Sequence, residues 1–333
     1  MALLRPMARR ERWSAPKVRP IGMLYKDLID AIGNTPLVEM PSFSPKGSVR
    51  LFAKLEGNNP TGSVKDRIAR AMVMRAEAEG LLSKDKVLLE PTSGNTGISL
   101  AMVTQRKGYR LKVVMPENVG PERLELLAAF GAEVEFSPAE LGTNGAIAVA
   151  QTMAAQNNRY VMLYQYGNEA NPGAHYETTG AEIIRDLPEV THFVAGLGTG
   201  GTLMGTGRRL KEHNPAITVI AAVPQPDDRV QGLRSLEEGF IPPILDLDLL
   251  DGRIMVSGEQ SFKMTAALLK NEGIFAGVSS GAVLAAALRV AQRLDSGNVV
   301  CLFADGGWKY LSTGLWTHEY ADIAEKVEKK IQW

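Results

Sequence analysis

The sequence predicts an α/β fold, and two of its features support this prediction. Short apolar runs rich in Val, Ile and Leu alternate with longer amphipathic stretches along most of the 333-residue chain. Glycine- and hydroxyl-rich turns follow several of these runs and lead directly into the next amphipathic stretch. Such alternation is typical of strands in parallel sheets that helices cover on both faces. A chain of this length can bury a large core and is expected to form two domains.

The elements are expected in a regular order. A short amphipathic helix over 24–32 ends at Gly33-Asn34 and precedes strands over 35–40 and 49–56. The turn Pro60-Thr61-Gly62 then leads into a helix, which Ser63 is expected to cap. Further strands are expected over 87–90, 111–115, 133–136, 161–164, 192–196, 218–223, 253–256 and 299–304. Helices are expected over 97–107, 121–130, 144–156, 176–186, 202–213, 259–272 and 281–294.

The composition argues against several classes of protein. The 37 basic residues balance 37 acidic ones, so binding to nucleic acid or to a membrane surface has no support from overall charge. No apolar run reaches the ~18 residues that a membrane-spanning helix needs. The single cysteine, Cys301, rules out an internal disulfide, lies in an apolar run typical of a buried strand, and fits a reducing, cytoplasmic compartment. The four histidines are scattered, so no metal site is expected.

Residues 1–20 carry six basic residues and a single acidic one, Glu11. A secretory signal peptide would need an apolar stretch behind these charges, and none follows. We interpret the segment as a solvated basic arm, with an organellar transit segment as the alternative.

One amine is a candidate for chemistry, that of Lys65 in the segment Pro60–Arg67. The turn places Lys65 in the first turn of the following helix, where the helix dipole disfavours a cation. Shielding from water would lower its pKa further and make the amine a nucleophile. A solvated surface lysine is the alternative that this segment alone leaves open.

Two further turns join a strand to a helix and could bind anions. Glu90–Gly97 presents hydroxyls and free backbone N–H groups that suit a carboxylate, although a well-capped helix would look the same. Gly196–Thr202 is richer in glycine, so its backbone can approach a phosphate closely. A dinucleotide site would need an acidic residue after the next strand, and that strand ends Ala222-Val223-Pro224. A single phosphate is therefore the better guest.

A third turn expected to join a strand to a helix, Gly277–Gly281, carries two serines and is a weak signal by itself. Together, however, three polar turns and one activated amine fit one small cofactor. Pyridoxal phosphate has an aldehyde for a lysine, a phosphate for a glycine loop, and a ring nitrogen and a phenolic oxygen that need partners.

Six segments, spread over residues 34–314, share their order with a known enzyme family: Asn34–Leu37, Pro60–Arg67, Thr92–Gly97, Gly198–Thr202, Gly277–Gly281 and Lys309–Gly314. Through them the chain resembles the β-family of pyridoxal-phosphate enzymes and, within it, the cysteine synthases. Tyr164–Asn168 and Glu272–Gly277 resemble the cysteine synthase B branch, which includes members that use O-phosphoserine.

The resemblance implies a fold type II enzyme with two open, twisted, mostly parallel sheets flanked by helices. The active site would lie in the cleft between two domains. Residues 58–167 would form the smaller, mobile N-terminal domain, and residues 21–57 with 168–333 the larger, cofactor-binding domain.

The resemblance also implies a role for each matching residue. Lys65 would be the Schiff-base lysine and the catalytic base, Asn95 would contact the cofactor's phenolic oxygen, and Ser279 would face its ring nitrogen. The cofactor's phosphate would be held by Gly198, Thr199, Gly200, Gly201 and Thr202. The substrate carboxylate would be held by Thr92, Ser93, Thr96 and Gln165.

A neutral hydroxyl at Ser279 does not keep the ring nitrogen protonated, which favours loss of a group from Cβ over long-lived carbanions. The implied reaction is β-replacement of an activated L-serine by a sulfur nucleophile, giving L-cysteine through an α-aminoacrylate. Arg234 matches the position by which O-phosphoserine users resemble one another. Because a guanidinium binds phosphate strongly, O-phosphoserine is favoured over O-acetylserine.

Three alternative functions remain open at this point. They are cystathionine β-synthase-type replacement with homocysteine, dehydration of serine or threonine, and a non-catalytic partner protein that binds the cofactor. The resemblance further implies a homodimer, with sulfide or the thiocarboxylate of a sulfur-carrier protein as the sulfur donor. The C-terminal Lys329–Trp333 resembles tails that fold over the site, whereas a frayed terminus is the alternative.

Overall fold

A computed structural model of the chain describes residues 24–323, except 93, 227 and 229. The basic arm over 1–20, Ser93 and the tail over 329–333 lie outside the described residues, so the predictions made for them are not addressed by the structure.

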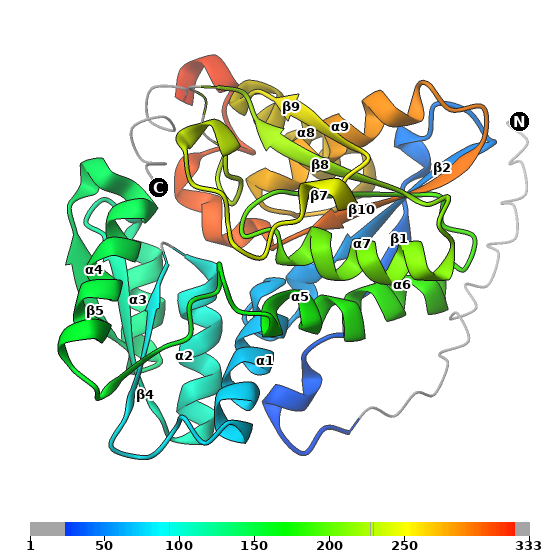
Figure 1. The fold of residues 1–333 in the computed structure, drawn as a ribbon. Helices are drawn as coiled ribbons and strands as arrows, with labels where there is room; N and C mark the ends of the chain where they lie inside the picture. Colours follow the sequence, from blue (N-terminus) through cyan, green and yellow to red (C-terminus); the bar gives the residue numbers. More distant parts are fainter. Residues whose placement is uncertain (1–23, 93, 227, 229, 324–333) are drawn as a thin grey trace, which may run out of the picture.

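Within the described residues, ten strands form two sheets (Figure 1). The larger sheet has the order β1-β2-β10-β7-β8-β9, with bounds Leu37–Glu39, Val49–Leu55, Gly297–Phe303, His192–Gly196, Thr218–Pro224 and Gly252–Val256. Its neighbours are parallel except for the antiparallel pair β1 and β2. The smaller, all-parallel sheet has the order β5-β4-β3-β6, with bounds Glu133–Ser137, Arg110–Pro116, Val87–Pro91 and Tyr160–Met162. The predicted α/β fold with two mostly parallel sheets is confirmed.

Helices cover both faces of the larger sheet, and alternate residues of β10 show this. Val299 and Cys301 belong to the core that α8 and α9 complete, whereas Val300 and Leu302 belong to the core under α6 and α7. These helices span Gly258–Glu272, Val278–Ala291, Ala181–Asp186 and Gly201–His213. Because successive side chains of a strand point to opposite faces, an all-apolar run such as residues 299–303 of β10 is buried from both sides. The predicted burial of Cys301 is confirmed.

The smaller sheet is also covered on two faces. Leu88 of β3 shares a core with Ile68 and Ile98, from α1 (Lys65–Ala78) and α2 (Asn95–Lys107), and α3 (Pro121–Ala129) closes its edge. The next residue, Leu89, packs with Ala146 on α4 (Gly142–Gln156) instead.

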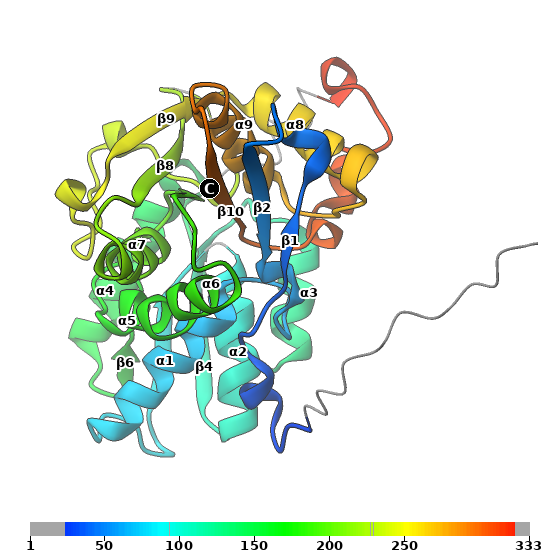
Figure 2. The ribbon, with the colours of Figure 1, turned by 90° about the vertical axis from the view of Figure 1, so that its right-hand side faces the viewer.

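The strands of the two sheets separate cleanly along the chain. Those of the smaller sheet lie between residues 87 and 162, and those of the larger sheet lie before 56 or after 191. We therefore propose the domain boundaries that the resemblance implies, with 58–167 as the smaller domain and 21–57 with 168–333 as the larger. Figure 2 shows β1 and β2, from the first part of the chain, beside β10 from the last.

Three expected elements differ from the structure in extent or kind. The helix expected over 24–32 is only a 3-10 turn, Leu28–Ala31, which the side chain of Asp27 caps. The helix expected to start near Tyr176 begins at Ala170, because Asn168 Oδ1 accepts a hydrogen bond from Ala170 N (3.0 Å), and it runs through α5 (Ala170–Ala174) and a π-helical stretch into α6. Gly277 is not preceded by a strand, because Ala276 forms only an isolated bridge with Gly306.

Ser63 does not cap α1 as expected. The N-cap position belongs to Val64, although Ser63 Oγ accepts a hydrogen bond from Lys65 N (3.4 Å). The reason is that the backbone here is tied to the other end of the chain: Ser63 bridges with Asp305, and Val64 N donates to Ala304 O (2.8 Å). The turn is instead held by Asp66, whose Oδ2 accepts from Thr61 N (2.7 Å).

Candidate active site

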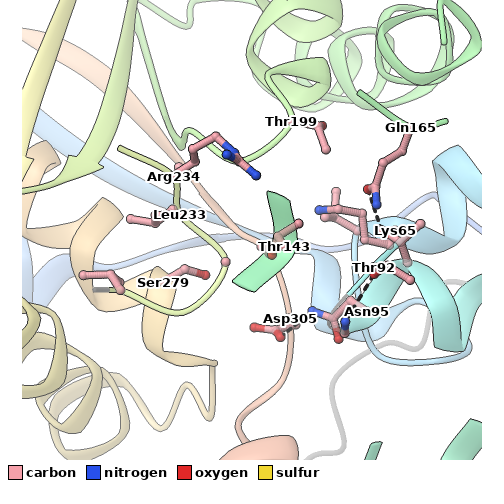
Figure 3. Close-up of a pocket in the computed structure, with 18 of the residues that line it drawn as sticks. Lys65, Thr92, Asn95, Thr143, Gln165, Thr199, Leu233, Arg234, Ser279 and Asp305 are labelled. Carbon is pink, nitrogen blue, oxygen red and sulfur yellow. Dashed lines mark hydrogen bonds between the residues drawn. The ribbon is translucent and has the colours of Figure 1, made fainter. Parts of the chain in front are cut away.

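A cavity of about 240 Å³ brings the start of α1 together with loops of both sheets. Lys65, the first residue of α1, lines it together with the loop before α7 and the loop before α2. Figure 3 shows Lys65, Thr92, Asn95 and Gln165 on one side of the cavity, and Arg234 and Ser279 on the other.

The surroundings of Lys65 favour its neutral amine. Burial lowers the pKa of Lys65, the carboxylate of Asp305 opposes this shift, and the nearby cation Lys309 reinforces it. A lowered pKa increases the share of unprotonated amine, which is the form that attacks a carbonyl or accepts a proton.

A buried ion cluster fixes the helix that carries Lys65. Arg67, two residues further along α1, is fully buried and donates to Glu56 through Nε (2.7 Å) and to Glu182 through Nη1 (2.7 Å). Lys54 Nζ donates to the other oxygen of Glu182 (2.6 Å) and to Thr35 O (2.6 Å). The cluster therefore joins α1 to β2 and α6, with two cations facing two carboxylates.

The glycine loop before α7 is shaped to stay free of side chains. Gly200 has φ +90°, a conformation that other residues rarely adopt. A Cβ on Gly201 would lie 1.8 Å from Asn171 Oδ1, and one on Gly198 would lie 2.9 Å from Gly232 O. The loop leads into the N-terminus of the 13-residue helix α7, whose first N–H groups and positive dipole end suit an anion.

Two threonines of this loop are held from behind. Asn171 Nδ2 donates to Thr199 Oγ1 (3.0 Å), and His175 Nε2 lies 3.2 Å from Thr202 Oγ1. Burial lowers the pKa of His175 to about 3, so its imidazole is neutral at neutral pH. A neutral imidazole supports the Thr202 hydroxyl without adding a charge.

The loop before α2 places hydroxyl and amide groups at a second helix start. Thr96 Oγ1 donates to Gln165 Oε1 (2.7 Å), and Thr92 Oγ1 accepts from Gly94 N (3.2 Å). Beneath them, Glu90 Oε1 accepts from Gln165 N (3.0 Å). Burial raises the pKa of Glu90 to about 8, so this carboxyl is largely neutral at pH 7 and adds little charge next to an incoming carboxylate.

Ser279 and Asn95 lie on different helices that face the same cavity. Ser279 is in the first turn of α9, and Asn95 is the first residue of α2. Asn95 Nδ2 donates to Asp305 Oδ2 (2.8 Å), and Asn95 Oδ1 accepts from Lys309 Nζ (2.6 Å).

Arg234 also lines the cavity and is nearly buried. Its guanidinium carbon lies 4.7 Å from the centre of the Phe240 ring, and its Nη1 donates to Asn144 Oδ1 (3.2 Å). Asn144 and Thr143 belong to the first turn of the 15-residue helix α4. A cation, a hydroxyl and a helix start therefore converge on one part of the cavity.

The structure brings most of the predicted site residues together. The predicted site residues that line the cavity are Lys65, Thr92, Asn95, Thr96, Gln165, Gly198, Thr199, Gly200, Thr202, Arg234 and Ser279. Gly201 lies behind the lining and packs against Asn171, and Ser93 lies outside the described residues.

Polar lining residues that sequence reasoning did not assign to the site include Arg123, Thr143, Asn144, Asp305 and Tyr310. Tyr310 lies in the segment Lys309–Gly314, which carried part of the resemblance, so a signal for it existed. The start of α4 gave none, because a Thr-Asn pair before a helix is an ordinary cap sequence.

Two kinds of feature are absent from the described part of the chain. No group of three or more His, Cys, Asp and Glu side chains is placed to bind a metal ion there. None of the described helices combines the length and apolar character needed to span a membrane.

Comparison with known proteins gives a consistent picture. Residues 28–305 match the family model described as pyridoxal-phosphate dependent enzyme. The chain belongs to this family.

Its relatives include a probable cysteine synthase of Bacillus subtilis, 45% identical over 301 residues, which cover 86% of this chain and 96% of the relative. Cysteine synthase B of Salmonella typhimurium is 41% identical over 294 residues, covering 88% and 97%. Among solved structures, O-acetyl serine sulfhydrylase isoform 3 of Entamoeba histolytica has a TM-score of 0.84 at 33% identity, covering 92% of this chain and 95% of the other. An O-ureido-L-serine synthase has a TM-score of 0.83 at 35% identity, covering 91% and 99%.

The cavity of this member of the family fits its cofactor. A glycine loop that would clash with added side chains leads to a helix start and suits a phosphate, while an amine with a lowered pKa lies in the same cavity. The hydroxyl of Ser279 and the amide of Asn95 line the same cavity and are suitable polar partners for the ring nitrogen and the phenolic oxygen of the cofactor.

Proposed function

We propose that the chain is a cysteine synthase, which replaces the Cβ substituent of an activated L-serine with sulfur to give L-cysteine. The observation that carries this proposal is the meeting of the Lys65 amine, the glycine loop and the Thr96–Gln165 pair in one cavity. The names of the relatives support the same reaction.

When bound, pyridoxal phosphate supplies an aldehyde for amines and a conjugated ring that withdraws electrons from the substrate's Cα. Gly198–Thr202 would hold its phosphate, and Asn95 and Ser279 would contact its phenolic oxygen and ring nitrogen. Lys65 Nζ would hold the cofactor at rest and, once free, accept the proton from Cα. The lowered pKa of Lys65 suits the second task because the amine is then unprotonated more often.

The loop before α2 would orient the substrate. Thr92, Thr96 and Gln165 are buried and bonded to neighbours, so their polar atoms are preorganised for the substrate carboxylate. Ser93 belongs to the same proposal by its position in the segment. Fixing the carboxylate fixes Cα, which keeps its proton within reach of Lys65.

Among activated serines, we favour O-phosphoserine. Arg234 is held between an aromatic ring and Asn144, and the start of α4 presents Thr143 beside it. A phosphate leaving group gains more from a guanidinium and a helix start than a neutral acetyl group does. O-Acetylserine remains the second candidate, since a relative of known structure bears that substrate in its name.

A matrix of donors and acceptors tests the proposal. Purified protein is assayed with O-phosphoserine, O-acetylserine and serine against sulfide, a carrier-protein thiocarboxylate and homocysteine. Arg234→Ala should lower kcat/KM for O-phosphoserine about a hundredfold, equivalent to about 2.7 kcal/mol, and change that for O-acetylserine little. Arg253→Ala, at an exposed arginine of β9, is the control. Equal losses for both donors would refute the role of Arg234, and turnover only with homocysteine would refute cysteine synthesis.

Borohydride treatment separates an enzyme from a non-catalytic binding protein. It should fix the cofactor to the peptide that contains Lys65, and adding O-phosphoserine first should prevent this. The homodimer and the choice between sulfide and a thiocarboxylate are also proposals drawn from the family, and sedimentation together with the acceptor arm of the matrix tests them.

A further inference from the structure

The segment that follows β10 holds the side chain of Asn95 from two sides. Lys309 lies on a 3-10 helix, Gly307–Thr313, and its Nζ donates to Asn95 Oδ1 at 2.6 Å. Asp305 Oδ2 accepts from Asn95 Nδ2 at 2.8 Å. Lys309 belongs to a motif that marked the resemblance, yet none of the roles assigned above uses it.

The chemistry of these two partners allows the amide only one orientation. A lysine nitrogen carries donors and its ammonium form has no acceptor, while a carboxylate only accepts. The opposite orientation would place the NH₂ group against the Lys309 ammonium, donor against donor, and the amide oxygen against the Asp305 carboxylate, acceptor against acceptor. Both hydrogen bonds would then be lost. Asn95 Nδ2 has two hydrogens, so one remains available for a ligand in the cavity after the bond to Asp305 is made.

The holding residues are themselves fixed. Asp305 is 2% exposed, and its Oδ2 also accepts from the Tyr310 hydroxyl at 2.7 Å. The ring of Trp308 covers the turn before Lys65, because a Cβ on Gly62 would lie only 2.2 Å from it. Burial lowers the pKa of Lys309, and Asp305 and Asp66 oppose that shift. The segment is thus a rigid support that contacts both Asn95 and the Lys65 turn.

We propose that Lys309 and Asp305 are positioning residues, which keep Asn95 Nδ2 directed as a donor toward the phenolic oxygen of the cofactor. This inference rests on the proposed contact between Asn95 and that oxygen. A fixed donor favours the ionised form of the oxygen, which can only accept. The segment therefore sets both the affinity for pyridoxal phosphate and the pH at which the bound cofactor changes its visible absorption.

A double-mutant cycle on the full chain tests the inference through the dissociation constant of pyridoxal phosphate, measured by equilibrium dialysis. Lys309→Met should weaken binding about tenfold, as expected for one hydrogen bond to a charged group, whereas Lys309→Arg keeps a donor and should stay within about threefold. In an Asn95→Ala background, Lys309→Met should cause no further loss, because its effect acts through the amide. The midpoint of the absorption titration should move upward in Lys309→Met and not in Lys309→Arg.

Several results would overturn the inference. An equal loss of affinity from Lys309→Met with and without Asn95 would show a general structural effect, which circular dichroism and melting of the cofactor-free variants would display directly. An unshifted absorption titration would remove the link to the phenolic oxygen. Unchanged affinity in Asn95→Ala alone would overturn the proposed cofactor contact on which the inference rests. None of these three outcomes depends on which serine derivative is the substrate.

Discussion

Arg67→Met should be among the most destabilising single substitutions in this chain. The side chain is fully buried, and its guanidinium donates to both oxygens of Glu56 and both oxygens of Glu182, at 2.7–2.8 Å. Methionine fills much of the volume but removes the cation that pairs with Glu56 and leaves Glu182 paired with Lys54 alone. Removing one partner of a buried ion pair costs about 3–5 kcal/mol because the remaining charge stays buried without compensation.

The expected change in melting temperature follows from the size of the chain. With about 2.1 cal/mol/K of unfolding entropy per residue, 333 residues give about 0.7 kcal/mol/K. A loss of about 4 kcal/mol therefore lowers the melting temperature by about 6 °C. Arg75→Met, on the exposed side of the same helix, removes only a surface pair with Glu79 and should leave the melting temperature nearly unchanged.

Scanning calorimetry of both variants without cofactor measures the difference. The cofactor is removed because weaker binding would lower the melting temperature by itself. A drop of less than about 1 °C in Arg67→Met, or equal drops in the two variants, would refute the view that the cluster stabilises the position of α1.

Three further predictions concern the glycine loop, the response of the ion cluster to acid, and Cys301. Gly201→Ala should abolish tight cofactor binding, since its Cβ would lie 1.8 Å from Asn171 Oδ1, while Gly173→Ala, with open space around it, should bind normally in the same dialysis assay. Burial would raise the pKa of Glu182, but Arg67 and Lys54 lower it to about 2, below the value in the unfolded chain. The ionised Glu182 therefore stabilises the folded state fully above about pH 5, and this stabilisation is lost as the pH falls toward 2. In urea titrations the free energy of unfolding should fall by about 3 kcal/mol over this range, and by less in Glu182→Gln. The buried thiol of Cys301, with its raised pKa, should react with a disulfide reagent only after unfolding, and rapid native labelling would contradict its burial.

Much of the fold was predictable because the central strands of both sheets are buried from both sides. A run such as Val299–Phe303 has no polar position, so it reads as a strand in any register. The errors fell where distant contacts decide the local structure. Ser63 has a good capping sequence, yet its backbone pairs with Asp305. The sequence within a few residues of Ser63 does not predict a pairing partner more than two hundred positions away.

The candidate site divides in the same way. Glycine loops and helix starts are local features, so Lys65, Thr96 and Gly198–Thr202 could be named from the sequence. The side chains that position the site residues could not be named in this way. Lys309, Asp305 and Asn144 act through contacts between segments that are distant in the sequence. The buried cluster around Arg67 is similar, since Glu182 joins Lys54, Glu56 and Arg67 from more than a hundred positions away, and the four become one neutral group only after folding.

The pairing of β2 with β10 governs the order in which this protein can fold during translation. Strand β2 is complete at residue 55, but its parallel neighbour ends at residue 303 of 333. The smaller sheet uses one continuous stretch and can assemble while synthesis continues, because its pairings are comparatively local. The β1–β2 hairpin must wait, with its apolar face uncovered, until β10 has left the ribosome, and a chaperone can protect it during that interval.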